Sequence, residues 1–241
     1  MKVKLNNPQL LANVITIISE MVAQVRLKFK DEYMELTAID PANVALTHLI
    51  IPKTSFVEYQ ATDETLGVNL DNFKNVLRRC KIGSKLTMES EDNLLKMDIE
   101  DKVKRSFTLA LIDIDHEEKQ MPNLSFKAEV EVDSQTFVES IEDCYIVADS
   151  ASLEAGNDKF IIEAKSLNSA RSEFSSDEAR ITATERCKSK YSLEYMQKFL
   201  KAAKFSEKIY LSFGNEYPLR MDFRNNVFEL SFILAPRVET E

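Results

Sequence analysis

The sequence repeats itself, and this internal repeat constrains the fold more than any other feature. Leu70–Met88, LDNFKNVLRRCKIGSKLTM, corresponds to Leu193–Leu211, LEYMQKFLKAAKFSEKIYL, at a constant offset of 123 residues. After one inserted residue, Leu95–Glu100 (LKMDIE) corresponds to Leu219–Arg224 (LRMDFR). Each copy has the pattern of a helix, a short turn, a strand, a tight turn and a second strand. We therefore expect two similar halves of roughly 115–120 residues each.

The beginnings of the two halves correspond as well. Pro8–Met21 places its apolar residues at helical spacing along one stripe, and Ser134–Ile146 does the same. Ser134 carries the kind of side chain that caps a helix N-terminus, so we expect it to be the N-cap of the second of these helices. Each half should then contain two helices.

Alternating or β-branched segments fill the rest of each half and predict strands. In the first half these segments are Val25–Phe29, Tyr33–Ala38, Val44–Ile51, Lys85–Ser90, Leu94–Glu100 and Ser106–Leu111. In the second half they are Phe160–Ala164, Arg171–Ser175, Ala179–Ala183, Lys208–Phe213, Leu219–Phe223 and Val227–Leu234. Strands outnumber helices, and few connections could contain a crossover helix. The expected class is α+β, with antiparallel sheets that carry helices on one face.

The segment Asp113–Asn123, DIDHEEKQMPN, separates the halves and has the composition of a linker. We expect an N-terminal half-domain at 1–112, a connecting loop at 113–123 and a C-terminal half-domain at 124–241. A metal site is the alternative for this segment, and its ligands would be Asp113, Asp115, His116 and Glu117. A solvated connector is favoured, because nothing in the segment makes these ligands converge.

Composition excludes several classes of function. No apolar run approaches the length of about 18 residues that a membrane span requires, and the N-terminus lacks the apolar region of a signal peptide. Cys80, Cys144 and Cys187 form no Cys-x-x-Cys pair, so we expect buried thiols in a reducing compartment and no zinc site or disulfide framework.

Catalytic patterns are missing too. The chain has four glycines, none in a phosphate-binding cluster, and two histidines, with no nucleophile elbow, HExxH or Walker loop. Some pair among the 40 carboxylates could always be nominated as acid and base, so such a choice carries no information. We expect no enzyme activity, no cofactor and no metal.

A strongly basic helix in a chain of net charge −9 is the sharpest functional signal. Its basic side chains gather between Leu70 and Lys81, and a second basic group follows in the repeated copy. On both helices the apolar residues occupy a separate stripe. A solvated helix surface is one explanation. Two equivalent basic faces favour attraction of phosphates instead. Because no aromatic residues interleave with them, weak, salt-dependent contact with the backbone of a duplex fits better than stacking on single strands.

Three further segments resemble a known family. Their sequences and positions are similar to motifs of DNA sliding clamps of the proliferating cell nuclear antigen (PCNA) type. The segments are LTAIDPANVALTHLIIP (Leu36–Pro52), YPLRMDF (Tyr217–Phe223) and FILAPRVE (Phe232–Glu239). The resemblance covers essentially the whole chain, the linker included. Because it lacks long loops, the chain resembles the archaeal members of the family more than the eukaryotic ones.

The resemblance implies a ring of three subunits with two similar halves each, sheets outside and helices around a hole that holds duplex DNA. The side chains it places against DNA are Lys74, Arg78, Arg79, Lys81, Lys198, Lys201 and Lys204. One departure concerns the first helix of each half, which is usually basic in the family. Here Pro8–Met21 has no Lys or Arg, and Ser134–Ile146 contains acidic residues at 139, 142 and 143. Either two helices per subunit carry the inner charge, or the chain is one member of a heterotrimer; we favour a homotrimer.

The resemblance also implies a groove for partner peptides and two edges that join subunits. The groove residues by position are Ile39, Asn43, Val44, Leu46, Met121, Pro122, Pro218, Ile233, Ala235 and Pro236. Core packing is the alternative for Val44, Leu46 and Ile233, and an aromatic residue is common in the family at position 233. The edges are about Arg105–Ile112 and Ala170–Ser176. Their candidate contacts are Arg105, Phe107, Leu109, Leu111, Arg171, Glu173 and Phe174.

The function expected from the resemblance is that of a processivity factor in DNA replication and repair. Its implied partners are duplex DNA, further subunits (identical or paralogous), a clamp loader, and a DNA polymerase, flap endonuclease and DNA ligase that carry PCNA-interacting peptides. The expected location is the cytoplasm with the nucleoid if the source is archaeal, and the nucleus if it is eukaryotic. A ring-shaped checkpoint or scaffold subunit is the first alternative, and a hydrolase in the acidic loops is the second.

Overall fold

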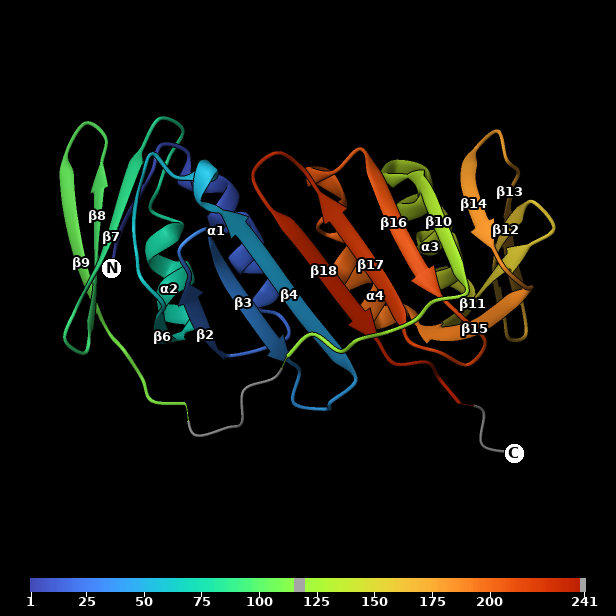
Figure 1. Ribbon diagram of the computed structural model, residues 1–241. Coiled ribbons are helices and arrows are strands. Elements are labelled where there is room, and N and C mark those ends of the chain that lie inside the picture. Colours follow the sequence, from blue (N-terminus) through green and yellow to red (C-terminus); the bar gives the residue numbers. More distant parts are fainter. Residues whose placement is uncertain (115–119, 239–241) are drawn as a thin grey trace. The chain divides into compact units, whose positions relative to one another are not determined.

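The computed structural model of the chain describes residues 1–114 and 120–238, and the chain divides into two compact units (Figure 1). Unit 1 comprises Met1–Pro41, Thr47–Met121 and Asn226–Glu229. Unit 2 comprises Ala42–Leu46, Pro122–Asn225 and Leu230–Glu241. Three of the residues named above as the alternative metal site, at positions 115, 116 and 117, lie outside the described residues.

Unit 1 contains two helices and antiparallel strands in two sheets. One sheet has the order β5-β1-β7-β8-β9, and a second sheet contributes the order β4-β3-β2-β6. The elements are β1 (Lys2–Leu5), α1 (Pro8–Ile18), β2 (Gln24–Phe29), β3 (Tyr33–Ile39), β4 (Ala45–Pro52), β5 (Glu58–Gln60), β6 (Glu64–Asn69), α2 (Leu70–Leu77), β7 (Lys85–Glu91), β8 (Leu94–Glu100) and β9 (Lys104–Ala110), with a 3₁₀ turn η1 (Lys53–Ser55).

Unit 2 repeats this arrangement. Its strands follow the orders β14-β10-β16-β17-β18 and β13-β12-β11-β15. The elements are β10 (Ala128–Asp133), α3 (Ser134–Val147), β11 (Ser150–Gly156), β12 (Lys159–Lys165), β13 (Ser169–Phe174), β14 (Ala179–Ala183), β15 (Cys187–Ser192), α4 (Leu193–Leu200), η2 (Ala203–Phe205), β16 (Lys208–Phe213), β17 (Leu219–Arg224) and β18 (Glu229–Leu234). The same order of elements in both units confirms the α+β class and the internal duplication.

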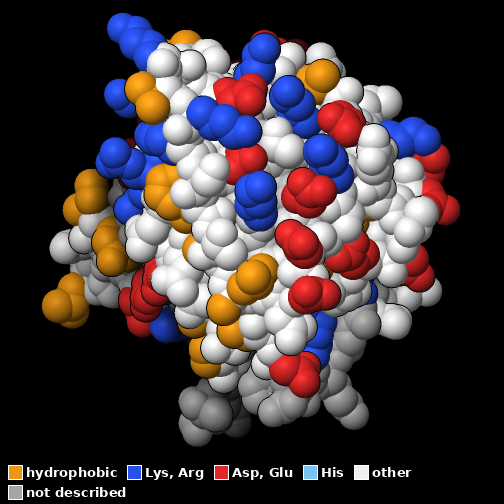
Figure 2. Space-filling view, turned by 90° about the vertical axis from the view of Figure 1, so that its left-hand side faces the viewer, with side chains coloured by type: hydrophobic (Ala, Val, Ile, Leu, Met, Phe, Trp, Pro, Cys, Tyr) orange, Lys and Arg blue, Asp and Glu red, His pale blue; other side chains and the backbone are white. Residues whose placement is uncertain are grey.

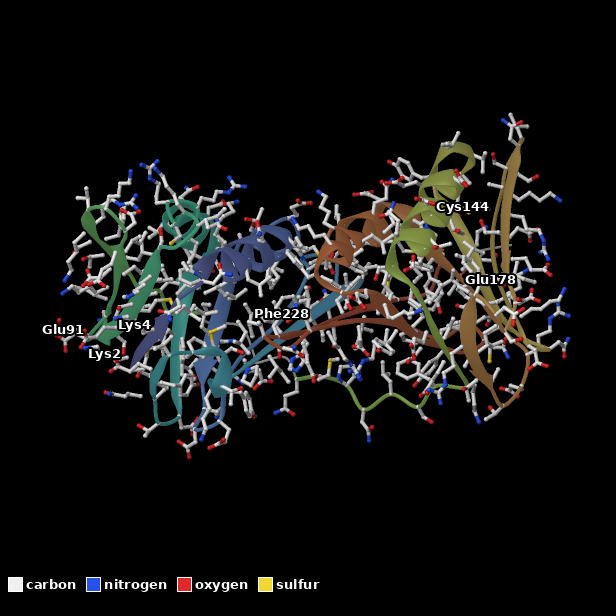
Figure 3. All side chains as sticks on the ribbon, turned by 90° about the horizontal axis from the view of Figure 1, so that it is seen from above. Lys2, Lys4, Glu91, Cys144, Glu178 and Phe228 are labelled. Atoms are coloured by element: carbon white, nitrogen blue, oxygen red, sulfur yellow. The ribbon has the colours of Figure 1, made fainter. Side chains whose placement is uncertain are left out.

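The strands alternate between core and solvent as their sequences predict. In β8, Leu95, Met97 and Ile99 are fully buried while the residues between them face outward. In β16, Ile209, Leu211 and Phe213 do the same. In each unit the helices lie on one side of the strands, so the other sheet face is left to solvent (Figure 3). In each unit, the exposed faces of the two helices therefore form one surface, called here the helical side of the unit.

The helices begin and end close to the predicted positions, with one correction. Ser134 is not the N-cap of α3; Asp133 is, because its Oδ1 accepts hydrogen bonds from the N–H and the hydroxyl of Thr136, each at 2.9 Å. Ser134 is the first helical residue, and its hydroxyl donates to the carbonyl of Ser206 at 2.6 Å. The helix α2 ends at Leu77, so Lys81 lies in the turn that follows.

Within residues 1–114 and 120–238, all twelve predicted strands are present, with ends shifted by a few residues, together with six strands that were not predicted. Among the residues that the structure describes, no helix is long and apolar enough to span a membrane. The core is made of aliphatic and phenyl side chains in both units, and it fixes the helices on their sheets.

Candidate nucleic-acid interface

The helix α2 separates a buried apolar stripe from an exposed basic one, as predicted. Leu70, Phe73 and Leu77 are fully buried. The ammonium of Lys74 lies 2.6 Å from Asp71 Oδ1 and 3.1 Å from Ser19 Oγ, the C-cap of α1. The other basic residues of the segment from Leu70 to Lys81 are Arg78, Arg79 and Lys81. They are exposed, and they make no ion pair within the described part of the chain. Their charges are therefore available to an outside anion.

The helix α4 repeats the apolar stripe but holds its cations differently. Lys198 donates to Glu194 Oε1 at 2.8 Å and lies 5.1 Å from the ring centre of Tyr195. The hydrogen bond from Lys198 lowers the pKa of the Glu194 carboxyl. Lys204 lies 4.9 Å from the ring centre of Phe205. Both ammonium groups stay on the surface, but one of them is partly neutralised by its own helix.

The first helix of each unit departs from a basic lining, in the way the sequence indicates. The exposed side chain of α1 is Asn13, whereas α3 exposes Glu139, Glu142 and Asp143. Figure 3 shows α3, marked by Cys144, on the helical side of unit 2. The helical face of unit 1 is thus clearly positive, while that of unit 2 mixes both signs.

Charged side chains of the helical side line hollows between the helices. A hollow of about 320 Å³ between α1 and α2 is lined by Thr16 and Arg78, and one of about 350 Å³ between α3 and α4 by Glu142 and Lys201. A wider hollow of about 600 Å³ lies beside the α3 N-terminus. Its charged lining consists of Asp133, Lys201, Lys204, Glu207 and Lys208. The sequence reasoning missed Lys208, because this residue begins a strand and belongs to no helical stripe.

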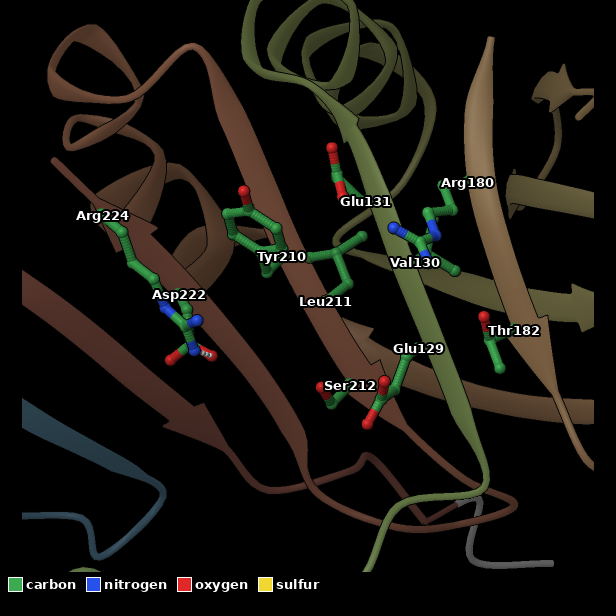
Figure 4. A pocket seen from close by; sticks show the side chains of 10 residues that line it. All are labelled: Glu129, Val130, Glu131, Arg180, Thr182, Tyr210, Leu211, Ser212, Asp222 and Arg224. Carbon is green, nitrogen blue, oxygen red and sulfur yellow. Dashed lines mark hydrogen bonds and ion pairs between the residues drawn. The ribbon is translucent and has the colours of Figure 1, made fainter. Parts of the chain in front are cut away.

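The opposite, solvent-facing side of the unit 2 sheet carries a polar hollow of about 330 Å³ (Figure 4). Asp222 is buried there, and its carboxylate accepts from Arg220 at 2.9 Å, Arg224 at 3.1 Å and Ser231 at 2.5 Å. With three donors on one carboxylate, this group is a structural anchor for β17 and β18. The surrounding wall is lined by Glu129, Glu131, Arg180, Thr182, Tyr210 and Ser212.

The edges expected to join subunits are outermost strands in their sheets. On β9, Phe107 and Leu109 are half-buried and share a sheet face with the buried Met97 and Leu95, their partners in register. Arg105 lies on the same face and pairs with Asp101. Leu111 follows the strand, half-buried. Figure 2 looks onto this end of unit 1, where basic, acidic and hydrophobic side chains are interspersed.

On β13, Arg171 and Glu173 face solvent and are 2.7 Å apart. Hydrogen bonds from Lys159 and then Arg171 lower the pKa of Glu173. Phe174 corrects the expectation of an exposed apolar contact, because it is only 4% exposed and packs on Phe160 with ring centres 5.6 Å apart. The one-residue alternation of the strand turns this side chain into the core.

The residues expected to form the peptide groove fall mostly in unit 2. The N–H of Ala235 donates to the carbonyl of Val44 at 2.9 Å, which ties the end of β18 to the segment before β4. Leu46 and Ile233 are buried. The half-buried members are Val44, Pro218, Ala235 and Pro236, and the exposed ones Asn43 and Pro122. Two further residues, Ile39 and Met121, belong to unit 1 and are half-buried.

Groups that could support other chemistry are engaged or buried. His48 Nδ1 lies 2.9 Å from the hydroxyl of Thr37. The three cysteines are buried as free thiols, and burial raises the pKa of Cys80 to about 11, so its thiolate is disfavoured. The residues described contain no group of three or more His, Cys, Asp or Glu side chains placed to hold a metal ion.

Comparison with known proteins gives a match to both halves. The family model described as "Proliferating cell nuclear antigen, N-terminal domain" matches residues 1–119, and the one described as its C-terminal domain matches residues 120–237. The "DNA polymerase sliding clamp 1" of Thermococcus kodakarensis is 32% identical over 241 residues, which cover 95% of this chain and 94% of the relative. The "DNA polymerase sliding clamp" of Methanothermobacter thermautotrophicus is 31% identical over 247 residues, or 100% and 99% of the two chains.

Solved structures share the fold over the full length. The proliferating cellular nuclear antigen of Entamoeba histolytica superimposes with a TM-score of 0.89 at 21% identity and 98% coverage of both chains. A chain of the PCNA2–PCNA3 complex of Sulfolobus tokodaii gives 0.88 at 26% identity, with 99% of this chain and 100% of that chain covered.

Proposed function

Because the chain belongs to the proliferating cell nuclear antigen family, the family of DNA polymerase sliding clamps, we propose that it closes into a three-subunit ring around duplex DNA and tethers replication enzymes there. The observation that carries this proposal is the match of both halves of the chain to the two domains of the family. The names of the curated relatives support a polymerase clamp and lend no support to the checkpoint or scaffold alternative.

The proposed DNA contacts are the exposed cations on the helical side of each unit. Arg78, Arg79 and Lys81 would face the phosphates from unit 1, with Lys74 held beside them by Asp71. From unit 2 the contacts would be Lys198, Lys201 and Lys204, and we add Lys208, which lines the same hollow as Lys201 and Lys204. Because closure of the ring itself retains the clamp, these contacts can stay weak, and weak contacts allow sliding.

Subunits are proposed to join through β9 of one copy and β13 of the next. A head-to-tail contact of this kind generates a ring when the rotation closes. Phe107 and Leu109 supply half-buried apolar surface on one edge, and Arg171 and Glu173 supply ordered charge on the other. Pairing would remove the unpaired backbone groups that make a free edge strand a hazard.

Partner enzymes are proposed to dock a short peptide beside the C-terminal end of β18. Val44, Pro218 and Ala235 are half-buried there and would form an apolar floor for the peptide's anchors. The chain itself is proposed to be non-catalytic and without a cofactor. The specific enzymes that bind, expected to be a polymerase, a flap endonuclease and a ligase, remain part of this proposal.

The experiment that tests the function combines mass and processivity. Native mass spectrometry of the purified chain should give three times the mass of 27.6 kDa that the sequence predicts. Addition of the chain, with a clamp loader and ATP, should lengthen the products of a family-matched polymerase on a primed circle. A strictly monomeric chain that also fails to assemble with sister chains would contradict the proposal.

A further inference from the structure

The two grooves between helices are structural counterparts within the duplicated chain. Leu11, Val14, Ile15 and Ile18 of α1 occupy the positions of Phe137, Ser140, Ile141 and Cys144 of α3, and all eight are buried. In the same alignment Thr16 corresponds to Glu142. At the offset of the second helices, Arg78 corresponds to Lys201. The grooves are also similar in size, at about 320 and 350 Å³.

The groove of unit 1 is positive. Its polar lining consists of Gln9, Asn13, Thr16 and Arg78, so the guanidinium is its one charged group among the described residues. The hydroxyl of Thr16 donates to the carbonyl of Ala12 at 2.7 Å and brings no charge. A phosphate that approaches this groove meets a cation and neutral donors.

The groove of unit 2 carries charges of both signs. Glu142 and Lys201 line the same hollow, together with the neutral Gln197. The Glu142 side chain is exposed, and it lines the hollow through which a phosphate would approach Lys201. The unit 2 groove therefore has a negative charge at Glu142, where the unit 1 groove has the neutral Thr16.

We propose that Glu142 cancels the attraction of Lys201 for DNA phosphates, so that backbone contact concentrates on the N-terminal unit at Arg78. This inference rests on the proposed function as a clamp. It makes the two helix grooves of each subunit differ: Arg78 attracts phosphates in the unit 1 groove, whereas Lys201 and Glu142 offset each other in the unit 2 groove, which leaves Lys198, Lys204 and Lys208 as the attractive groups of unit 2. Fewer attractive sites let the duplex shift and tilt within the ring at a lower electrostatic cost.

Reciprocal charge changes test the inference, because the chain supplies its own matched positions. Glu142→Gln removes the carboxylate from the unit 2 groove without changing its shape, and Thr16→Glu adds one to the unit 1 groove. The binding of the assembled protein to a short blunt-ended duplex, which can thread the ring without a loader, is measured by fluorescence anisotropy between about 50 and 200 mM salt.

The expected results have opposite signs. For each groove that meets a phosphate, Glu142→Gln should tighten binding about fivefold at low salt, and Thr16→Glu should weaken it by a similar factor, as expected for one close charge pair in water. The slope of log affinity against log salt should steepen with Glu142→Gln by about 0.9 for each additional phosphate that the ring neutralises. Circular dichroism and native mass of each variant establish that fold and assembly are intact.

A double-mutant cycle makes the test decisive. In the wild-type background Arg78→Ala should reduce affinity more than Lys201→Ala does, and in the Glu142→Gln background the two losses should become equal. Equal losses in the wild-type background, or no response to Glu142→Gln, would overturn the inference and leave the clamp function standing. A wild-type ring that bound no duplex at any salt would contradict the proposed function itself, and the inference with it.

Discussion

Phe199 of α4 stacks face to face on Phe232 of β18, with ring centres 4.4 Å apart and planes 4° from parallel. Both rings are fully buried, and Phe223 meets Phe232 edge-on at 5.9 Å. This stack fixes the rotation of α4 about its axis, because the helix cannot turn without pulling Phe199 out of the core. The orientation of Lys198 and Lys201 toward solvent is therefore a consequence of aromatic packing.

Loss of this stack should cost stability. We expect Phe232→Ala to lower the free energy of unfolding by about 3–5 kcal/mol, since it removes a buried ring and leaves a cavity. Chemical denaturation followed by circular dichroism measures the change. The matched control is Phe205→Ala, whose ring is half-buried beside Lys204, and its loss should be clearly smaller. Equal losses for the two variants would show that the stack does not anchor α4.

The cap of α3 should make stability depend on pH at the acid end. Hydrogen bonds from the N–H and hydroxyl of Thr136 lower the pKa of Asp133 in the folded chain. The stabilisation is therefore present above the unfolded pKa of about 3.9 and is lost as the pH falls through the lower folded value.

Two substitutions separate the cap from its charge. Asp133→Ala should cost about 1 kcal/mol at pH 7, whereas Asp133→Asn keeps an acceptor and should cost less. Urea unfolding from pH 7 down to about 3 should show the wild-type advantage over Asp133→Asn shrinking with acid. An advantage that stays constant over that range would mean that the carboxylate charge contributes nothing.

The edge strand β9 predicts a face-dependent effect on assembly. Phe107→Glu places a charge among half-buried apolar side chains and should dissociate the ring into monomers at micromolar concentration. Thr108→Glu puts the same charge on the other, exposed face of the strand and should weaken assembly much less. Sedimentation velocity distinguishes the two. If Thr108→Glu proved the more disruptive, the apolar face would not be the one that joins subunits.

The proposed peptide groove predicts a selective loss of partner binding. Val44→Glu should reduce the affinity for a synthetic PCNA-interacting peptide at least about tenfold, because an apolar anchor would meet a carboxylate. Val57→Glu, at a side chain 60% exposed in unit 1, serves as the control and should bind as the wild type does. Calorimetric titration measures both. Unchanged affinity in Val44→Glu would move the groove away from this segment.

Much of the fold could be predicted from the sequence because the duplication repeats its strongest signals. The apolar stripes of α1 to α4 have helical period, and β8 and β17 have the strand alternation in both copies. β1, KVKL, and β10, AEVEVD, were missed although they alternate, but two other missed strands lack those signals. β11, SASLEAG, is built of small residues, and β15, CKSKYS, is mostly polar. They are strands because β11 pairs with β12 on one side and with β15 on the other.

The candidate interface was predictable in part for a similar reason. The basic stripes are local features, so Arg78 and Lys201 were found from spacing alone. The pairing of Glu142 with the groove of Lys201 depends on how α3 packs on α4, and residues about 60 positions apart give no local signal of it. The inward turn of Phe174 follows from strand register, which a one-residue error in the predicted edge would reverse.

Retention on circular DNA tests the central claim most directly, because a ring that encircles a duplex is held by topology and not by affinity. The protein is loaded onto a nicked circular plasmid with a clamp loader, separated from free protein by gel filtration in salt high enough to screen phosphate contacts, and then challenged with a restriction enzyme. We predict that the protein stays with the circle and slides off once the plasmid is linear. Equal retention on circular and linear DNA, or none on either, would contradict the account.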